Sequence, residues 1–252
     1  MLHLIAFAQL ETQEELFLVQ YLQTNYGIRG LTMMKIFLDT SNVEEIRKRY
    51  YTGLIDGVTT NPTLMYKEGR NPVEVIKEIQ EIFIDDPEAS ISAEVSGNTA
   101  DEMLAMAEDY LGIGPAITIK VPCTVDGLLA CKILSEQDIK VNVTLIFNAA
   151  QAILAAKAGA TYVSPFVGRL DDQSIAGLEV VRSIADIYCR HGIRTQVLAA
   201  SIREVHRAVR SWYNGASVCT LPLKTFDAMY NHILTDKGLE QFNADWAALM
   251  ND

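Results

Sequence analysis

The chain has 252 residues, of which 49% are hydrophobic and 21% are charged, so it is long enough to form one large domain with a buried core. Its formal net charge of −11 argues against a surface that binds nucleic acid or an anionic membrane. An anionic substrate must therefore bind through a few local basic groups.

Residues 1–33 differ from the rest of the chain. Their apolar stretches are interrupted by polar and acidic residues between Gln9 and Glu15, and no basic segment precedes them, so neither a signal peptide nor a membrane-spanning helix fits. We expect the compact domain to occupy residues 34–252. Residues 1–33 then form an N-terminal extension, either an upstream continuation of the reading frame or a segment whose helix, Glu11–Leu22, docks on the domain.

From Lys35 onward, short apolar segments alternate with longer segments of helical periodicity. The predicted strands are Lys35–Asp39, Gly57–Asn61, Ile91–Ser96, Ile117–Pro122, Lys140–Ile146, Thr161–Val167, Thr195–Ala200 and Ser217–Pro222. The predicted helices are Val43–Tyr50, Pro72–Phe83, Ala100–Tyr110, Val125–Ser135, Ala149–Ala158, Gln173–Cys189, Ile202–Trp212 and Thr225–Ile233. Apolar strands alternating with helices indicate a parallel sheet, and eight such units predict a single (β/α)8 TIM barrel. Asp236–Met250 would add a C-terminal helix outside the barrel.

The strand ends are marked by helix-start signals and by polar residues. Three capping-box patterns follow predicted strands, namely Ser41-x-x-Glu44, Thr99-x-x-Glu102 and Ser201-x-x-Glu204. In a TIM barrel the carboxyl ends of the strands meet at one mouth, where catalysis takes place. The polar residues that should gather there are Asp39, Asn61, Glu94, Lys120, Asn142, Thr144, Ser164 and Ser201.

Lys120 lies near the end of the apolar segment Ile117–Pro122. Burial among β-branched side chains disfavours the protonated amine and favours the nucleophilic free base. Lys120 is therefore a candidate for forming a Schiff base with a carbonyl substrate. The alternative is a lysine at a strand edge whose amine reaches water.

No metal site is expected. The cysteines form no C-x-x-C pair, and the histidines fall singly, so neither a zinc site nor a disulfide framework is indicated. The residues concerned are Cys123, Cys131, Cys189, Cys219, His3, His191, His206 and His232. Reduced thiols are the simplest interpretation, which indicates a cytoplasmic protein.

Seven segments in order along the chain carry a resemblance to a known family. They are Leu38–Ser41, Gly57–Pro62, Ile119–Pro122, Asn142–Phe147, Ala150–Ala152, Ser164–Arg169 and Ala199–Arg203. Together they resemble the transaldolases, and in size the short subfamily that also includes fructose-6-phosphate aldolase. The resemblance covers essentially all of residues 34–252 and leaves out the extension.

The resemblance implies a mechanism based on Lys120, which would attack the C2 carbonyl of a ketose and form a protonated imine that accepts electrons when the C3–C4 bond breaks. Asp39 would take the proton from the C4 hydroxyl, unless it is only a helix cap. Glu94 and Thr144 would hold a water for proton transfer at the imine. The alternatives are a structural ion pair between Glu94 and Lys120 and a strand-filling role for Thr144.

The substrate would be held at two ends. The hydroxyls of the three-carbon unit would bind to Asn61, Asn142 and Ser164. The phosphate would bind to Arg169, Ser201 and Arg203, near the start of the helix after strand seven. Each group has an ordinary alternative: a turn before a proline for the first asparagine, surface ion pairs for the arginines and a helix cap for the last serine.

Two positions distinguish transfer from simple aldol cleavage within the family. Fructose-6-phosphate aldolases resemble one another in carrying glutamine on strand three and tyrosine on strand six, where this chain has Glu94 and Phe166, the transaldolase residues. We therefore expect a transaldolase of the pentose phosphate pathway without cofactor or metal. It would move a dihydroxyacetone unit from sedoheptulose 7-phosphate or fructose 6-phosphate to an aldose phosphate. Fructose-6-phosphate aldolase and a non-catalytic phosphosugar-binding barrel are the alternatives.

The expected partners are sugar phosphates, without nucleic acid or membrane. The resemblance to the short subfamily also implies a homo-oligomer built from rings, such as a decamer.

Overall fold

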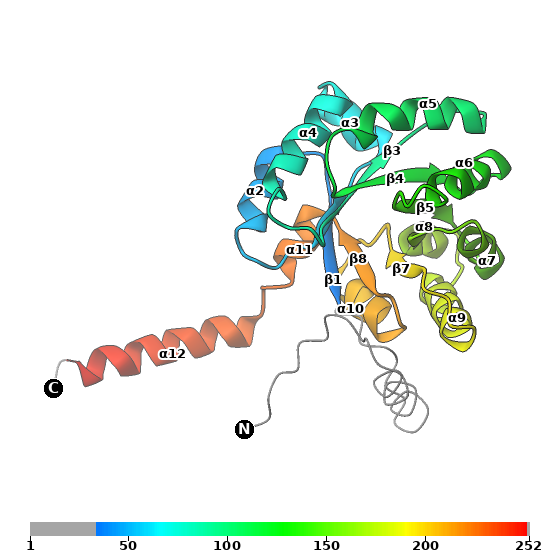
Figure 1. Ribbon diagram of the computed structural model, residues 1–252. Coiled ribbons are helices and arrows are strands. Elements are labelled where there is room, and N and C mark those ends of the chain that lie inside the picture. Colours follow the sequence, from blue (N-terminus) through cyan, green and yellow to red (C-terminus); the bar gives the residue numbers. More distant parts are fainter. Residues whose placement is uncertain (1–33, 251–252) are drawn as a thin grey trace, which may run out of the picture. The chain divides into compact units, whose positions relative to one another are not determined.

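The computed structural model describes residues 34–250, and the predicted N-terminal extension, residues 1–33, lies outside the described residues. Eight parallel strands close into a barrel in chain order, β1 to β8 (Figure 1). The strands are β1 (Lys35–Asp39), β2 (Gly57–Thr59), β3 (Ser90–Glu94), β4 (Ile117–Pro122), β5 (Val141–Ile146), β6 (Tyr162–Pro165), β7 (Gln196–Ala199) and β8 (Val218–Leu221). The predicted TIM barrel is confirmed.

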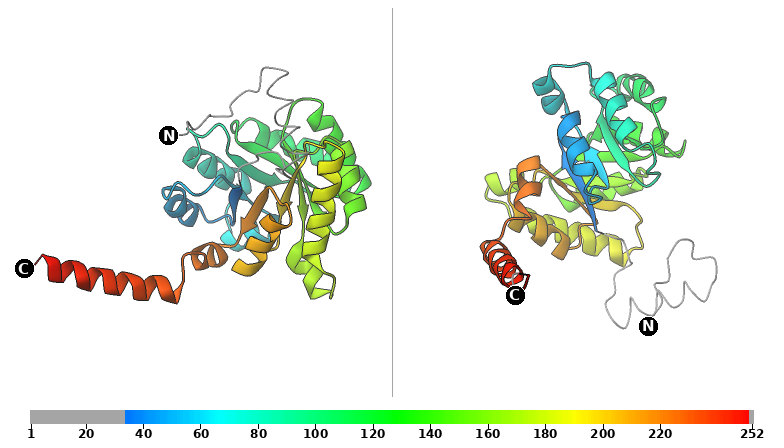
Figure 2. Two further views of the ribbon diagram at one scale, coloured as in Figure 1. Left: turned by 90° about the horizontal axis from the view of Figure 1, so that it is seen from below. Right: turned by 90° about the vertical axis from the view of Figure 1, so that its left-hand side faces the viewer.

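Helices follow the strands, and all of them except the last lie around the outside of the barrel (Figure 2). They are α2 (Val43–Tyr50), α3 (Pro62–Glu68), α4 (Pro72–Ile82), α5 (Ala100–Leu111), α6 (Val125–Ser135), α7 (Ala149–Lys157), α8 (Val167–Asp172), α9 (Gly177–Arg190), α10 (Val205–Tyr213), α11 (Leu223–Ala228) and α12 (Ile233–Leu249). The last of these is the predicted C-terminal helix. None of the residues of α12 is buried.

Side chains alternate between the interior of the barrel and its outer face, because successive residues of a strand point in opposite directions. The outward-facing residues pack against the helices in the main hydrophobic core, which includes Leu38, Val58, Ile91, Ile119, Val143, Val163 and Val197. The inward-facing residues toward the amino ends of the strands form a second apolar cluster of Phe37, Tyr162, Leu198 and Val218. A Cβ at Gly57 would lie 2.8 Å from the ring of Phe37, so this glycine makes room for the aromatic side chain.

Farther along the same inward faces, the interior becomes polar. Hydroxyl and amide groups of different strands bond to one another in the pairs Ser90–Thr118 at 2.8 Å, Thr59–Thr220 at 2.6 Å, Asn142–Ser92 at 3.1 Å and Ser164–Asn142 at 2.7 Å. Because these buried groups satisfy one another, the interior tolerates them. The last inward positions before each strand ends then face the mouth.

Two short helices were not predicted, α3 and α8. The α3 helix begins directly after β2, because the side chain of Asn61 accepts a hydrogen bond from the backbone N–H of Leu64 at 3.0 Å and Pro62 occupies the first turn. The asparagine followed by a proline is thus a helix-start signal that the sequence already contained. The α8 helix has only six residues and no side-chain cap, which leaves little periodicity to detect.

One of the three predicted capping boxes is confirmed and two are wrong. Thr99 and Glu102 form the box at the start of α5. At α2 the cap is Asn42 rather than Ser41. Ser201 has a left-handed backbone with φ of 58°, whereas a capping residue is usually extended, and α10 starts only after Glu204.

Within residues 34–250, no helix has both the length and the apolar run that crossing a membrane requires.

Candidate active site

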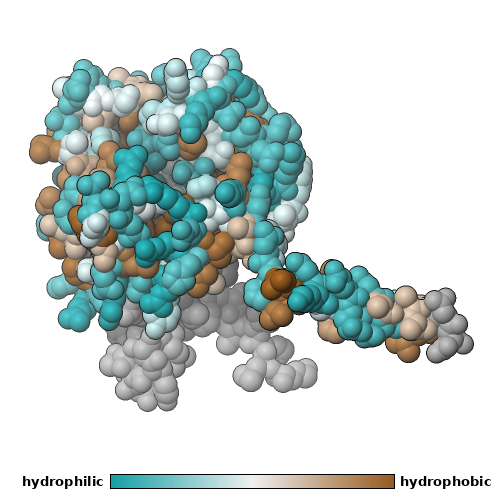
Figure 3. Space-filling model, turned by 180° about the vertical axis from the view of Figure 1, so that it is seen from behind, coloured by the Kyte–Doolittle hydropathy of each residue, from teal (hydrophilic) through white to brown (hydrophobic). Residues whose placement is uncertain are grey.

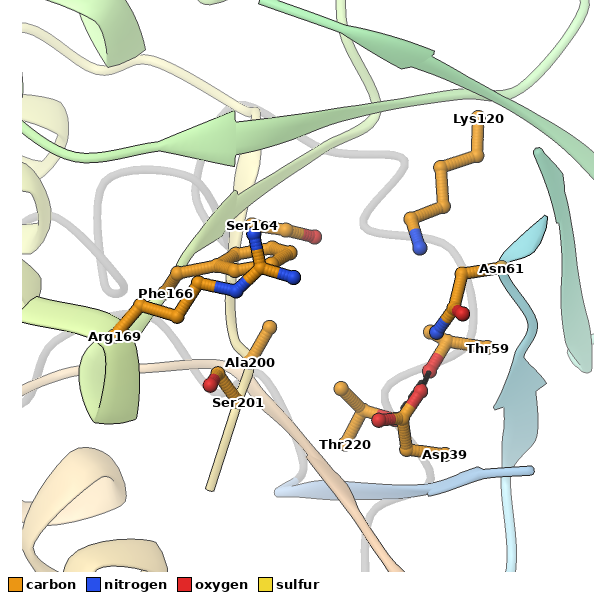
Figure 4. Close-up of a pocket in the computed structure, with 10 residues that line it drawn as sticks. All are labelled: Asp39, Thr59, Asn61, Lys120, Ser164, Phe166, Arg169, Ala200, Ser201 and Thr220. Carbon is orange, nitrogen blue, oxygen red and sulfur yellow. Dashed lines mark hydrogen bonds between the residues drawn. The ribbon is translucent and has the colours of Figure 1, made fainter. Parts of the chain in front are cut away.

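A cavity of about 110 Å³ opens at the carboxyl ends of the strands, as expected for a TIM barrel (Figure 4). Its lining residues are Asp39, Thr59, Asn61, Lys120, Ser164, Phe166, Arg169, Ala200, Ser201 and Thr220. Seven of them were selected from the sequence. The other four selected residues, Glu94, Asn142, Thr144 and Arg203, are not part of this lining.

Lys120 is only 5% exposed and lies on β4, where its register partner on β3 is Glu94. Its Nζ atom is 2.9 Å from Oε2 of Glu94 and donates a hydrogen bond to the carbonyl oxygen of Thr60, also at 2.9 Å. A buried charge is tolerated only when it is paired and hydrogen-bonded, and both conditions are met. The ion pair that was the alternative interpretation of Glu94 is therefore present, and the carboxylate also lies where it can accept a proton from the amine.

Asp39 lies on the same side of the cavity as Lys120, opposite Phe166 and Arg169 (Figure 4). Burial raises the pKa of its carboxyl above the ordinary value of 3.8, while the nearby charge of Lys120 and a hydrogen bond from Thr59 act in the opposite direction. That bond, from the hydroxyl of Thr59 to Oδ1, measures 2.9 Å, and the same hydroxyl contacts the hydroxyl of Thr220 at 2.6 Å. A carboxylate with a raised pKa exchanges protons with hydroxyl groups more readily than an ordinary one. Asp39 is not the cap of α2.

Asn142 and Ser164 form a connected pair on β5 and β6. The Ser164 hydroxyl donates to Oδ1 of Asn142 at 2.7 Å, and the Asn142 amide donates to the hydroxyl of Ser92 at 3.1 Å. Ser164 lines the cavity, whereas Asn142 is fully buried behind it. In this arrangement Asn142 fixes the orientation of Ser164.

Thr144 lies at an irregular point of β5. The pairing of β5 with β6 shifts register between Val143 and Ile146, and Leu145 adopts a left-handed backbone with φ of 59°. Such bulges redirect a neighbouring side chain and are common beside active sites. The hydroxyl of Thr144 is buried and has no hydrogen-bond partner among residues 34–250, so it can bond a water or a substrate atom.

Arg169 reaches the cavity from α8, and its guanidinium stacks on the ring of Phe166 at 4.9 Å from the ring centroid (Figure 4). The ring of Phe147 supports Phe166 from 5.8 Å away. The stack gives a positive group a fixed place in the cavity wall without neutralising its charge. Arg169 is therefore available to an anion.

Ser201 meets the start of α8 at very short range. The backbone N–H of Gly168 donates to the carbonyl oxygen of Ser201 at 3.1 Å, and a Cβ on Gly168 would stand 2.2 Å from that oxygen. Only glycine allows this approach, which holds the segment after β7 against the segment after β6. Ser201 is thereby positioned beside Arg169 in the cavity lining.

Arg203 is engaged outside the cavity. Its two terminal nitrogens donate to the two carboxylate oxygens of Asp172. This ion pair lowers the pKa of Asp172 and raises that of Arg203. The surface ion pair that was the alternative interpretation of Arg203 is therefore present. Arg203 can also bind a substrate phosphate only through the N–H groups that this ion pair does not use.

Sequence reasoning did not select three lining residues, Thr59, Ala200 and Thr220. A signal was present for the two threonines, because each is a polar residue at an inward-facing position of an apolar strand, two residues after Gly57 or Val218. Ala200 carries no polar group that could have attracted notice.

Metal ligands do not gather in the part of the chain that the structure describes: no group of three or more histidine, cysteine, aspartate or glutamate side chains is arranged to hold an ion there. The four cysteines are unpaired, and burial raises the pKa of Cys131 to about 12. Among the lysine and cysteine side chains of residues 34–250, that of Lys120 is the only one in the cavity lining.

Comparison with known proteins points to one family. A sequence model described as transaldolase/fructose-6-phosphate aldolase matches residues 36–252. A protein of Paracoccus denitrificans named "Probable transaldolase" is 54% identical over 214 residues, which cover 85% of this chain and 97% of the relative. Proteins of Caulobacter vibrioides ("Probable transaldolase") and Listeria monocytogenes ("Probable transaldolase 1") are each 50% identical over 215 residues, covering 85% of this chain and 97% and 99% of the relatives.

A solved structure supports the fold independently. The thiamine phosphate pyrophosphorylase from Pyrococcus furiosus aligns with a TM-score of 0.53 at 16% identity, over 75% of this chain and 85% of that chain. A likeness at this level of identity shows the barrel fold alone.

Proposed function

Because this chain belongs to the transaldolase/fructose-6-phosphate aldolase family, we propose that it transfers a dihydroxyacetone unit between sugar phosphates through a Schiff base on Lys120. The reaction would convert sedoheptulose 7-phosphate and glyceraldehyde 3-phosphate to erythrose 4-phosphate and fructose 6-phosphate, in the pentose phosphate pathway. The observation that carries the proposal is the buried amine of Lys120, which is paired with Glu94 and lines the same cavity as Asp39.

The first stage forms the imine. Transfer of a proton from Lys120 to Glu94 over 2.9 Å leaves a free amine, which attacks the C2 carbonyl of the ketose. The carbonyl oxygen takes up one proton from the attacking nitrogen and a second from the protonated Glu94, leaves as water and yields a protonated imine. A water held between Glu94 and the unpartnered hydroxyl of Thr144 would carry these protons.

The second stage breaks the C3–C4 bond. Asp39 removes the proton of the C4 hydroxyl, and the C4 oxygen becomes the carbonyl of the aldose that leaves. The electrons of the C3–C4 bond form the C2–C3 double bond of an enamine, while the electron pair of the C=N bond moves onto the nitrogen of Lys120. The raised pKa of Asp39 suits a group that must accept this proton and return it during condensation with the acceptor aldehyde. The chemistry written in this way uses side chains and water alone.

The remaining cavity residues would orient the substrate. Asn61 and Ser164 would bond the hydroxyls of the three-carbon unit, with Asn142 acting through Ser164. The phosphate would lie against Arg169 and Ser201. Arg203 would complete this end of the site, as argued below.

The first test is trapping of the imine. Borohydride treatment in the presence of fructose 6-phosphate should add a stable three-carbon mass to the peptide that contains Lys120. Labelling of another lysine, or persistence of labelling in Lys120→Ala, would falsify the assignment. Activity lost in a chelator and restored by a divalent metal would contradict the metal-free mechanism.

A second test separates transfer from cleavage. We propose transfer because Phe166 places a ring without a hydroxyl in the cavity wall. Turnover of fructose 6-phosphate should then depend on an acceptor aldehyde. Rapid release of dihydroxyacetone without an acceptor would favour fructose-6-phosphate aldolase, and turnover under neither condition would favour a non-catalytic phosphosugar-binding barrel.

We further propose a cytoplasmic homo-oligomer, a decamer if it follows the short subfamily. The support is α12, on which the large apolar side chains of Leu239, Phe242 and Trp246 are exposed. Figure 3 shows hydrophobic side chains near both ends of this helix, with a mostly hydrophilic stretch between them on the face in view. A face of this kind marks an interaction surface. Sedimentation should give a mass several times that of one chain, and a monomer would contradict this proposal.

A further inference from the structure

We propose that Asp172 is a positioning residue for phosphate binding: it holds the end of the Arg203 guanidinium so that the Nε side of that group stays turned toward Ser201. The inference rests on the proposed function, since it concerns the phosphate of the substrate. It assigns a role to a carboxylate that touches neither the cavity nor the reacting carbons.

The first support is the geometry of the ion pair. Nη1 of Arg203 donates to Oδ1 of Asp172, and Nη2 donates to Oδ2. A guanidinium has five N–H donors in one plane, and this end-on fork uses two of them. The Nε–H and the outer hydrogen atoms remain free for a second anion. Asp172 therefore fixes the plane of Arg203 without exhausting its donors.

The second support is the direction in which the Nε side faces. The point at which a Cβ would stand on Gly168 is 3.1 Å from Nε of Arg203 and also 3.1 Å from Oγ of Ser201. Nε of Arg203 and Oγ of Ser201 thus both approach the side of Gly168 that carries no Cβ. Ser201 lines the cavity beside Arg169. A phosphate that binds at Oγ of Ser201 is therefore near the free side of Arg203.

The third support is that Ser201 is shared by two hollows. It lines the catalytic cavity, and it also lines an adjoining hollow together with Arg203 and Asp172. The carboxylate of Asp172 holds the arginine from that adjoining side. In this arrangement the phosphate meets Nε while the carboxylate retains the terminal nitrogens.

The ion pair between Arg203 and Asp172 can be removed by mutation without unfolding the protein. The side chains of Arg203 and Asp172 are 56% and 44% exposed, and ion pairs this exposed contribute little to stability. A second ion pair, between Nε of Arg207 and Asp171 at 3.2 Å, joins α10 to α8 nearby. Arg207 is therefore a matched control, because its loss removes an ion pair in the same region without touching Arg203.

The test compares Asp172→Asn, Asp172→Glu and Arg207→Gln in the full chain. Asp172→Asn should raise the KM for fructose 6-phosphate and the Kd for inorganic phosphate by about threefold to tenfold, because an unfixed arginine must be ordered on binding. The kcat and the turnover of unphosphorylated fructose should not change. Asp172→Glu, which keeps the charge, should recover part of the affinity, and Arg207→Gln should match the unmutated protein.

A double variant shows whether Asp172 acts through Arg203. Arg203→Ala and Arg203→Ala/Asp172→Asn should bind phosphate equally weakly, because the carboxylate then has nothing to position. A lower KM in Asp172→Asn would overturn the inference, since it would mean that Asp172 competes with the phosphate. An unchanged KM, or additive losses in the double variant, would also overturn it while leaving the proposed phosphate site intact. Unaltered phosphate affinity in Arg203→Ala would refute the phosphate role of Arg203 itself, and this inference with it.

Discussion

The two halves of the barrel mouth hold their charged groups in different ways. In the first half, Asp39, Glu94 and Lys120 are carried by β1, β3 and β4, and their contacts run between neighbouring strands of the barrel. In the second half, Arg169, Ser201 and Arg203 follow β6 and β7, on a short helix and a loop. The charged groups are buried or half-buried in the first half and exposed in the second.

This difference separates the two tasks of the enzyme. A buried ion pair whose partner is removed is expensive, so the first half tolerates little change and keeps its reacting atoms fixed. The exposed groups of the second half can be exchanged at low cost to the fold. Changes in the first half should therefore affect every substrate, and changes in the second half only phosphorylated ones.

The largest effect is expected for Lys120→Ala. Without the amine no imine can form, so kcat should fall by at least about 10⁴-fold, the scale on which losing a covalent nucleophile acts. Phosphorylated and unphosphorylated donors should be affected alike. The measurement is transfer activity at saturating donor and acceptor, together with circular dichroism to verify the fold.

Its control is the partner of the ion pair. Glu94→Gln retains the shape of the side chain and leaves Lys120 in place, so imine trapping should persist at a reduced rate. Activity that survives Lys120→Ala in a folded protein would contradict the assignment of catalysis to the first half, because another residue would then have to be the nucleophile.

The next effect is expected for Asp39→Asn, which should lower kcat by about 10²-fold to 10⁴-fold, the usual contribution of a general base. In the unmutated enzyme, cleavage requires the ionised carboxylate. Because burial raises the pKa of Asp39 above 3.8, activity should fall on the acid side at a higher pH than for an ordinary aspartate. The measurement is the pH profile of kcat. An acid limb at the ordinary aspartate value would contradict this assignment.

The same variant should gain stability near neutral pH. A carboxyl whose pKa is raised by folding stabilises the fold most when protonated, and that contribution is lost as the pH rises through the raised pKa. Asparagine avoids this loss, so the Tm of Asp39→Asn should exceed that of the unmutated protein at neutral pH. The difference should shrink as the pH falls toward 3.8. A lower Tm at every pH would mean that Asp39 is a structural residue.

Much of the first half was predictable from the sequence. Asp39 and Lys120 each end an apolar segment, and the closed parallel barrel brings all such ends to one mouth. The period of two then places Glu94 on the inward face, beside Lys120 in register. These are consequences of strand geometry, which follows from a short apolar pattern.

The second half was predictable only in part. The residue types were selected, but Ser201 was wrongly interpreted as a helix cap, because its left-handed backbone depends on the approach of Gly168 from another segment. The engagement of Arg203 by Asp172 joins residues that are 31 positions apart on two connections. Contacts of this kind arise from tertiary packing of loops and leave no periodic trace in the sequence.

The next largest loss of activity is expected when either of the two arginines is replaced. Arg169→Ala and Arg203→Ala should each weaken phosphorylated substrates by about 10-fold to 100-fold, the range for losing a charge-assisted hydrogen bond. The loss should be larger for Arg169, which lines the cavity and stacks on Phe166, whereas Arg203 lies outside the lining. The measurement is kcat/KM for fructose 6-phosphate and for fructose. Equal losses for both sugars would mean that the arginines are structural.

The smallest effect concerns Phe166, which follows β6 and stacks with Arg169 in the second half. After cleavage, the enamine on Lys120 either adds to an aldehyde or takes a proton at carbon and is released as dihydroxyacetone. Phe166→Tyr adds a hydroxyl that can bond near that carbon or a catalytic water, so release relative to transfer should rise by about twofold to tenfold, the scale of one hydrogen bond. The ring remains, so the stack with Arg169 at 4.9 Å and the KM for phosphorylated donors should be preserved.

Phe166→Leu provides the matched control, because it removes the ring without adding a hydroxyl. It should raise the KM for phosphorylated donors by about twofold to fivefold through loss of the cation–π contact, while the ratio of release to transfer stays unchanged. The two variants thus separate the effect of a polar group on the enamine from the effect of the ring that stacks on Arg169. If Phe166→Tyr is folded and leaves the ratio of release to transfer unchanged, the side chain of Phe166 contributes only to phosphate binding in the second half. The choice between transfer and cleavage must then rest on Glu94 or on another group of the first half.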